Sequence, residues 1–578
     1  MKRCPQCGRE YDVTMSYCLD DGSELLYSPA SGSGSEPSLS AVRQFDEPQT
    51  AILHETAPPS EARTAAQIHT TEQTAVLPSG ITEIPKARGF DKRLLFAPLG
   101  IVIIILGGFF GYRYVAQAKQ INSIAVMPFV NESGNADIDY LTDGMTDTLI
   151  SSLSQVPNLS VKAHTSVFRY KGKETSPKAV ASDLNVQAIL NGRVMERGDQ
   201  LTVSLELIDP QTENVLWSEK YDRKQADLVS LQKEIASDVS SKLTAKLSGE
   251  DAQKITKSNT ANTEAYQLYL KGRFYWNQRT AAALRQAAEY FQQAIDKDPN
   301  YALAYSGLAD CYALLPNYGG GTSQEYFPKA KAAALKSVEL DDNLAEGHAS
   351  LGNIIIGFEW NVPDSTREFK RAIELNPNYA TAHHWYSDGP LLATRQLDES
   401  IAEMKKAQAI DPLSLIINGE LGATYVYARQ YDAAVDQLRK TVQMDDTFYY
   451  GHWNLGIAYR MKGQYPQAIA EYQRAFDLNQ DPSILAFIGE VQAASGDRAA
   501  AMKTLDDLKE RAKKGYVPPY SFAILDAALG DKDEAFRQLD EAYNSHALEL
   551  QLLRVDTMID SLRGDPRLDA LTKRVFKE

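Results

Sequence analysis

Apolar and polar positions alternate with the period of an amphipathic helix over the second half of the chain, and the pattern repeats. Each unit ends in a short acidic or amide phrase, and these are Asp298-Pro299, Asp341-Asp342, Asn376-Pro377, Asp411-Pro412, Asp445-Asp446 and Asp481-Pro482. After one longer first interval the phrases recur about every 34 or 35 residues. One pair of helices cannot bury its apolar face alone, so stacked pairs are expected to form a solenoid. The pattern predicts seven to eight helix pairs over residues 263–545 and capping helices over residues 546–578.

Small and aromatic residues recur at fixed positions within the units. Gly422 and Gly456 occupy equivalent positions, where a missing side chain lets the two helices of a unit touch, and aromatic residues fill the gaps between units. The period and these positions resemble the tetratricopeptide repeat. The resemblance implies an all-α superhelix, the dominant part of the fold, whose concave face binds a protein or peptide partner.

Polar and aromatic positions of the first helix of each pair are candidates for that face, and they are His348, Asn353, His383, Asn418, Tyr425 and Asn454. Most aromatic residues in such repeats are packing residues, so the sequence does not separate the inner face from the core. His383 and His384 are interpreted as a packed pair rather than a metal site, because no carboxylate or cysteine accompanies them at ligand spacing. Pro390 falls inside an expected first helix, which it should break or kink.

A different pattern covers residues 121–250. The predicted strands lie at residues 123–130, 159–168, 188–194 and 200–208, and a further strand ends at Leu216-Trp217. The predicted helices lie at residues 140–155, 177–184 and 227–247. The strands at residues 188–194 and 200–208 alternate apolar and polar positions on either side of Arg197-Gly198-Asp199, which predicts a β-hairpin. Together these elements predict an α/β domain.

Several phrases of this domain resemble the TolB-type amino-terminal domain of bacterial sensor-like proteins, and they lie at residues 123–130, 140–144, 167–172, 191–193 and 216–217. In such relatives the domain commonly sits between a membrane span and a tetratricopeptide array. The resemblance supplies no catalytic residues.

The N-terminal residues 1–27 carry three of the four cysteines of the chain. Cys4, Cys7 and Cys18 with Asp21 form a C-x2-C-x10-C-x2-D arrangement, whose two short turns can direct four ligands to one tetrahedral zinc ion. Carboxylate oxygen suits zinc less well than thiolate, so Asp21 is the weakest of the four ligands. The segment resembles the short zinc ribbons of bacterial membrane-anchored proteins, which implies a structural Zn²⁺. The alternative is a metal-free turn motif with reactive thiols.

The next segments predict a linker and a membrane span. Residues 28–93 are rich in Ser, Pro, Thr, Ala and Glu, which is typical of a disordered tether. Within it a short phrase recurs around Thr50 and Thr74, which is interpreted as chance similarity rather than a duplicated motif. Residues 94–115 contain an uncharged apolar run that is long enough to cross a bilayer as one helix.

Basic residues flank this run unequally, with Lys86, Arg88, Lys92 and Arg93 before it and Arg113 and Lys119 after it. By the positive-inside rule the N-terminus is expected in the cytoplasm and the region after the span outside it, in the bacterial inner membrane. Gly100, Gly107 and Gly111 share one face of the predicted helix, where they would allow a homodimer of spans.

Charge and motif content disfavour two classes of function, nucleic-acid binding and catalysis. The 578 residues carry 60 Lys and Arg against 76 Asp and Glu, a net charge of −16, which disfavours nucleic acid as a partner. No phosphate-binding loop, kinase motif or nucleophile elbow is present, so the chain is expected not to be an enzyme.

The sequence thus predicts a multidomain chain with a zinc ribbon, one transmembrane helix, an α/β domain and a repeat superhelix. The expected function is a non-enzymatic, membrane-anchored scaffold or signalling receptor that binds a protein partner. A cell-envelope assembly factor is the alternative, followed by a transcription regulator or an enzyme accessory subunit.

Overall fold

The computed structural model describes part of the chain, namely residues 2–3, 10–11, 26–27, 121–243, 255, 257, 259–318 and 321–578. These residues belong to two compact units, Met1–Leu94 and Leu95–Glu578. In the first unit three short strands form an antiparallel sheet in the order β2-β1-β3, and they are β1 (Lys2–Arg3), β2 (Glu10–Tyr11) and β3 (Leu26–Tyr27). Cys4, Cys7, Cys18 and Asp21 lie outside the described residues.

The localisation predicted from the sequence requires correction. In the part of the chain that the structure describes, no helix is long and apolar enough to cross a membrane, which contradicts a single-pass membrane protein. The longest of these helices, α10 (Ser323–Leu340), is amphipathic and carries Glu325, Lys329 and Lys336. Residues 28–93 and 94–115, with Gly100, Gly107 and Gly111, lie outside the described residues.

The second unit begins with an α/β module built on a mixed sheet in the order β6-β4-β7-β8-β9, with β5 also paired to β7. Its strands are β4 (Ser123–Val126), β5 (Val130–Asn131), β6 (Ser160–Val161), β7 (Ala188–Arg197), β8 (Gln200–Ile208) and β9 (Val215–Lys224). β4 pairs in parallel with β6 and β7, whereas β7, β8 and β9 form an antiparallel meander. The predicted hairpin is confirmed, because Arg197 pairs with Gln200 across a turn in which Gly198 adopts a φ of 65°.

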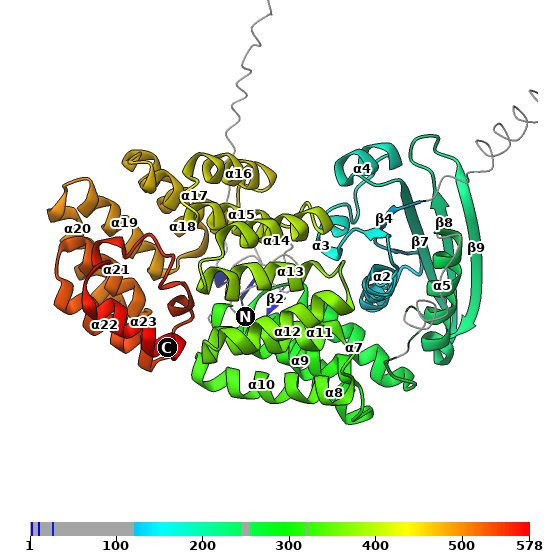
Figure 1. The fold of residues 1–578 in the computed structure, drawn as a ribbon. Helices are drawn as coiled ribbons and strands as arrows, with labels where there is room; N and C mark the ends of the chain where they lie inside the picture. The colour runs from blue at the N-terminus through cyan, green and yellow to red at the C-terminus, as the bar shows by residue number, and fades with distance from the viewer. Residues whose placement is uncertain are drawn as a thin grey trace, which may run out of the picture. The chain divides into compact units, whose positions relative to one another are not determined.

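Helices pack beside the sheet of this module (Figure 1). They are α2 (Asp139–Ser154), α3 (His164–Phe168), α4 (Pro177–Leu184) and α5 (Leu228–Leu243), with the 3-10 turns η1 (Ala136–Ile138) and η2 (Gln225–Asp227). The strand predicted at residues 159–168 was wrong in its second half, where the chain turns into α3. His164 and Phe168 stack with ring centroids 3.7 Å apart, a contact between positions i and i+4 that favours the helix.

From residue 259 onward the described residues form eight consecutive helix pairs, which run from green to red in Figure 1. The first helices are α7 (Thr263–Trp276), α9 (Ala302–Leu314), α11 (Ala345–Ile354), α13 (Ala380–Tyr386), α15 (Leu415–Tyr427), α17 (Tyr449–Met461), α19 (Pro482–Ala494) and α21 (Pro519–Leu529). The second helices are α8 (Ala281–Lys297), α10, α12 (Val362–Leu375), α14 (Leu397–Ile410), α16 (Tyr431–Met444), α18 (Tyr465–Asn479), α20 (Arg498–Ala512) and α22 (Lys532–Asn544).

Glycine sets the close packing of the two helices in a pair. A Cβ added to Gly422 would lie 2.3 Å from Leu438 Cγ, and one added to Gly456 would lie 2.6 Å from Tyr472 Cδ1. Leu438 and Tyr472 are fully buried. The steric role predicted for these glycines therefore matches the structure.

Two first helices lengthen into π-helical turns, η4 (Ile355–Glu359) after α11 and η5 (Ser387–Leu391) after α13. Pro390 lies inside η5, so the predicted disturbance is a widened turn and the chain remains helical through Leu392. η3 (Leu315–Tyr318) extends α9 in a similar place as a 3-10 turn.

A further segment and one helix follow the eighth helix pair. Residues 545–563, here named the return segment, contain η6 (Leu548–Leu552) and η7 (Asp560–Leu562) and precede α23 (Pro566–Phe576). His546 stacks on Phe358 and Trp360, with ring centroids 4.5 and 5.2 Å apart. Arg429 donates two hydrogen bonds to the carboxylate of Asp560, at 2.6 and 2.9 Å. The return segment thus packs against the third and fifth helix pairs, while α23 packs on α22.

Candidate functional site

A cavity of about 2120 Å³ runs along the inner side of the repeat array. All eight first helices, from α7 to α21, contribute residues to its lining, and so do the turns between helices. The return segment and the α2, α3 and α5 helices of the α/β module contribute further residues. The cavity is therefore built from segments that are hundreds of residues apart in the sequence.

Helical periodicity brings the lining side chains to one face. On α17, Tyr450, Trp453 and Ile457 are spaced i, i+3 and i+7, and all three line the cavity. On α15, Glu420 and Tyr427 share a face in the same way. The second helices lie behind this layer and contribute few side chains.

Part of the cavity lining comes from the junction between the α/β module and the array, which ion pairs and hydrogen bonds hold together. Arg273 of α7 donates to Asp147 of α2 at 2.9 Å, and its guanidinium lies 4.3 Å from the ring centroid of Trp276. Burial would raise the pKa of Asp147, but Arg273 and His164 outweigh burial and lower it. Because both partners are charged and desolvated, this pair fixes α2 on α7.

A second set of contacts joins the module to the turns that follow the second helices. Asn378 donates to the carbonyl oxygens of Ser154 and Leu159, at 2.9 and 3.2 Å. Lys162 donates to the carbonyl of Ala409 at 2.7 Å. Ser166 donates to Asp411 at 2.5 Å. The acidic and amide phrases that mark the repeats in the sequence therefore also hold the α/β module.

Another part of the cavity, here named its acidic end, is acidic and aromatic. Asp388, Glu420, Glu549 and Asp556 line it together with the aromatic residues Tyr427, Tyr450, Trp453 and Tyr520. Tyr450 donates to Glu420 at 2.7 Å and Tyr520 donates to Asp556 at 2.6 Å. Burial raises the pKa of Asp388 to about 6.

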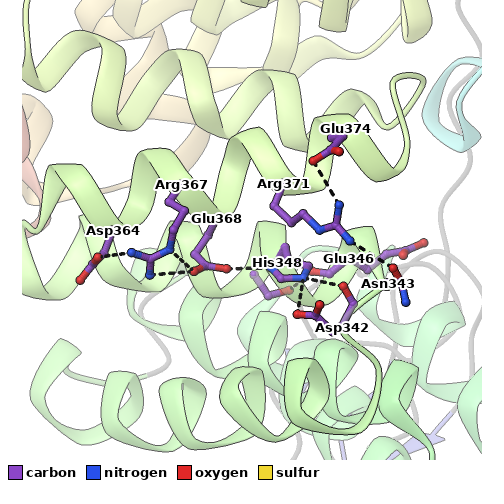
Figure 2. Close-up of polar contacts among 10 residues, drawn as sticks. Asp342, Asn343, Glu346, His348, Asp364, Arg367, Glu368, Arg371 and Glu374 are labelled. Atoms are coloured by element: carbon purple, nitrogen blue, oxygen red, sulfur yellow. Dashed lines mark hydrogen bonds and ion pairs between the residues drawn. The ribbon is translucent and has the colours of Figure 1, made fainter.

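Two of the predicted groove residues, Asn353 and Asn454, line the cavity, whereas the predicted histidines do not. His348 Nδ1 is 2.7 Å from Glu368 Oε2, and its Nε2 is 3.1 Å from the carbonyl oxygen of Asp342 (Figure 2). Arg367 donates to the other carboxylate oxygen of Glu368 and to Asp364, which extends the network along α12 (Figure 2). His348 thus ties α11 to α12 and is turned away from the inner face.

The same arrangement recurs in two other helix pairs. His383 Nδ1 is 2.5 Å from Glu403 Oε2, and His452 Nδ1 is 2.6 Å from Glu471 Oε2. Each ring also places Nε2 near the carbonyl oxygen six residues earlier. In the fifth pair Asn418 takes the place of the histidine, donating to the carbonyl of Pro412 at 2.9 Å and accepting from a glutamine side chain at 2.9 Å.

The interpretation of His383 and His384 as a packed pair needs one correction, because His383 does have a carboxylate partner, 20 residues away on α14. His384 instead lines the cavity, where burial and the charge of Arg279 lower its pKa to about 4. Within the described ranges no group of histidine, cysteine and carboxylate side chains can hold a metal ion. Tyr425, the remaining predicted residue, packs against the core.

Sequence reasoning missed the acidic end of the cavity. Glu420 and Tyr427 carried a detectable signal, since a charged and an aromatic residue seven positions apart share one helical face. Asp556 carried none, because only the path of the return segment brings it there.

Family models match three regions of the chain. Residues 269–321 and 449–482 match the tetratricopeptide repeat. Residues 119–238 match the second domain of HilA/YgeH-like transcriptional regulators. The TolB-type interpretation of this α/β region stays a prediction.

Two curated relatives are similar over part of their length. "Putative adenylate cyclase 3" of Rhizobium meliloti (strain 1021) is 30% identical over 231 residues, which is 40% of this chain and 39% of the relative. "Transcriptional regulator HilA" of Salmonella typhimurium is 31% identical over 163 residues, which is 28% of this chain and 29% of the relative. The similarity thus spans less than half of either relative.

Solved structures match part of this chain at low identity. YrrB, described as a TPR protein with an unusual peptide-binding site, is 20% identical with a TM-score of 0.25, covering 34% of this chain and 94% of YrrB. PilF of Pseudomonas aeruginosa is 18% identical with a TM-score of 0.30, covering 37% of this chain and 93% of PilF. From the family models, the repeat array contains tetratricopeptide repeats, and an α/β module similar to a domain of HilA/YgeH-like regulators precedes it.

Proposed function

We propose that this chain is a non-enzymatic binding protein, and that the cavity of its repeat array holds an extended segment of a protein partner. The observation that carries the proposal is the cavity lined by successive first helices. Stacked repeats create extended concave surfaces, and proteins with such repeats use them to bind protein or peptide segments.

The size of the cavity favours a peptide over a small molecule. Its volume of about 2120 Å³ exceeds the roughly 300–1,000 Å³ of ordinary small-molecule pockets. The lining offers partly buried aromatic side chains, among them Tyr427, Tyr449 and Trp453. Tyrosine and tryptophan are the residue types that contribute most to protein–protein affinity.

Site-directed photocrosslinking in the full chain tests this proposal. Ile416 is 42% exposed and lines the cavity, whereas Leu335 is 48% exposed on α10 and does not. A photoreactive phenylalanine at Ile416 is expected to yield a discrete crosslinked partner in cells, and the same label at Leu335 is the matched control. Equal labelling at both sites, or none at Ile416, contradicts binding in the cavity.

The relative named as a cyclase calls for a direct test of the non-enzymatic assignment. The chain lacks a phosphate-binding loop, and the similarity to that relative covers only 39% of its length. Full-length protein incubated with ATP and Mg²⁺ or Mn²⁺ is expected to form no cyclic AMP. Turnover that disappears on mutation of a cavity residue would refute the assignment.

A second role, regulation of another protein by the bound partner, is supported by the fixed contact between module and array. Arg273 joins α7 to Asp147, and both lie at the edge of the cavity. Occupation of the cavity would therefore act on α2 directly. Hydrogen exchange of α2 and α3 is expected to slow when the partner binds, and unchanged exchange would contradict this role.

We also propose that Cys4, Cys7, Cys18 and Asp21 bind one structural Zn²⁺, since a segment this short has too small a core to fold alone. Elemental analysis of the purified chain is expected to find one zinc per molecule. Cys4→Ser with Cys7→Ser should remove it, and Asp21→Asn should weaken retention in the presence of a chelator. Zinc retained by the double variant would refute this ligand set.

A further inference from the structure

The acidic end of the cavity holds carboxylates that lack a positive partner. Asp388, Glu420, Glu549 and Asp556 all line it, and none forms an ion pair with a basic side chain among the described residues. Arg563 donates to the backbone carbonyl of Asp556 at 2.8 Å and to the side chain of Asp560 at 2.9 Å. The cluster therefore gathers carboxyl groups without a basic partner in a partly desolvated space.

Some other buried carboxylates of the array have a basic partner, whereas Asp310, Asp411 and Asp526 likewise form no ion pair among the described residues. Glu490 of α19 is 3% exposed and receives a bidentate interaction from Arg460 of α17 at 2.5 to 3.0 Å. Glu368 and Glu403 are paired with histidines. The Arg460–Glu490 pair joins the first helices of the sixth and seventh pairs, so the layer of first helices in this array accommodates a guanidinium against a carboxylate.

Burial makes ionisation of these carboxyl groups unfavourable. Burial raises the pKa of Glu420 well above its usual range, and the charge of Asp388 raises it further. Burial also raises the pKa of Glu549 and of Asp556. A cation placed among these groups would remove the repulsion between them.

Two further features point to a ligand. Thr557, next to Asp556 in the cavity lining, is 5% exposed, and its Oγ1 has no hydrogen-bond partner among the described residues. Buried hydroxyl groups in native proteins are normally hydrogen-bonded, so this one calls for an external partner. The rings of Tyr427, Tyr450 and Trp453 line the same end, and aromatic faces attract cations.

We infer that the acidic end of the cavity receives the side chain of an arginine or lysine, so that the partner segment carries a basic residue at this point. The inference rests on the proposed peptide-binding function and specifies its ligand. Arginine fits better than lysine, because a planar guanidinium bridges two carboxylates and stacks on aromatic rings at the same time. Glu420 and Asp388 supply the central pair of carboxylates.

Fluorescence anisotropy with two labelled nonapeptide pools tests the inference on the full chain. Both pools are randomised at the flanking positions, and one has arginine and the other glutamine at the centre. The arginine pool is expected to bind about tenfold more tightly or better. The double variant Asp388→Asn, Glu420→Gln should abolish this preference, and Glu420→Gln alone, which keeps an acceptor for Tyr450, should reduce it.

Asp526→Asn is the matched control. Asp526 is 3% exposed, lies outside the cavity lining, and has a pKa raised to about 6, chiefly by burial. This variant should retain the preference for arginine. Retained preference in the double variant, or equal binding of the two pools to the unmodified chain, overturns the inference.

The outcomes separate this inference from the proposed function. If both pools bind equally well and the bound peptides also block crosslinking at Ile416, the proposed peptide binding stands. Only the inferred preference for a basic residue is then refuted. Failure of both pools while a partner still crosslinks at Ile416 does the same. Failure of both pools together with no crosslink at Ile416 refutes the two proposals at once.

Discussion

The hydrogen bond between His348 and Glu368 should contribute a pH-dependent part of the stability of the third helix pair. Both ring nitrogens of His348 face acceptors, Glu368 Oε2 at 2.7 Å and the carbonyl oxygen of Asp342 at 3.1 Å. Only the imidazolium donates to both. Burial opposes the charged ring, but the bonds to Glu368 and Asp342 outweigh it and raise the pKa of His348. The bond from His348 lowers the pKa of Glu368.

The perturbation is Glu368→Gln. The two side chains are 5% and 10% exposed, so solvent screens the interaction little. A hydrogen bond to a charged group contributes about 1.5–3 kcal/mol, and we expect the variant to lose about 2 kcal/mol of local unfolding free energy at pH 5.5. The matched double variant His348→Asn, Glu368→Gln copies the neutral Asn418 pair of the fifth unit and should recover part of that loss.

The sign of the pH dependence follows from the two shifts. Because the pKa of His348 is raised on folding, its contribution is complete below its ordinary value near 6.5 and is lost as pH rises through the raised value. Because the pKa of Glu368 is lowered, its contribution is present above its ordinary value near 4.5 and is lost as pH falls through the lowered value. The difference between wild type and Glu368→Gln should therefore be largest between about pH 4.5 and 6.5.

Hydrogen exchange of α11 and α12, measured at pH 5.5 and at pH 8.5 and corrected for intrinsic rates, reports the local free energy. The variant should exchange faster than wild type at pH 5.5 and approach it at pH 8.5. An equal difference at both pH values, or a double variant less stable than the single one, would refute a charged His348.

Three other changes test the packing of the chain. Gly456→Ala should destabilise the sixth pair by about 1–3 kcal/mol in urea unfolding, because the new Cβ would lie 2.6 Å from the buried ring of Tyr472; an unchanged midpoint contradicts the steric role. Arg273→Ala should cost about 3–5 kcal/mol at the module–array contact, since it leaves Asp147 buried without its main partner, and limited proteolysis between module and array measures the loosening. Arg429→Ala should cost less than about 1 kcal/mol by thermal unfolding, because that ion pair is over one third exposed, so a larger loss would show that the return segment depends on it.

The repeat array was predictable because its signal is local. The spacing of the acidic and amide phrases and the position of Gly422 reflect contacts within one helix pair, and Leu438, which Gly422 meets, is only 16 residues away. The hairpin at Gly198 was predictable for the same reason, since its turn and its alternation are adjacent in the sequence. Period and turn chemistry therefore suffice for these elements.

The candidate site was only partly predictable. His348 and Asn353 both lie on the same first helix, yet only Asn353 faces the cavity, because the ring of His348 reaches Glu368 on the next helix. Whether a side chain of a first helix faces the cavity therefore depends on its contacts with the next helix and not on its residue type. Asp556 enters the site through a chain reversal that no repeat period encodes.

The return segment changes how the array behaves as a whole. In an open solenoid the terminal repeats fray independently, and a ligand can be laid in from the side. Here His546 is held against Trp360 and against Phe358, which is 188 residues away, and Asp560 is held against Arg429, 131 residues away, so each contact closes a long loop of the chain. A long partner must either insert one of its chain ends into the cavity or bind after the return segment has dissociated from the third and fifth helix pairs. Association would then be slow and dissociation equally slow, so that the lifetime of a complex depends on the attachment of the return segment as much as on the contacts inside the cavity.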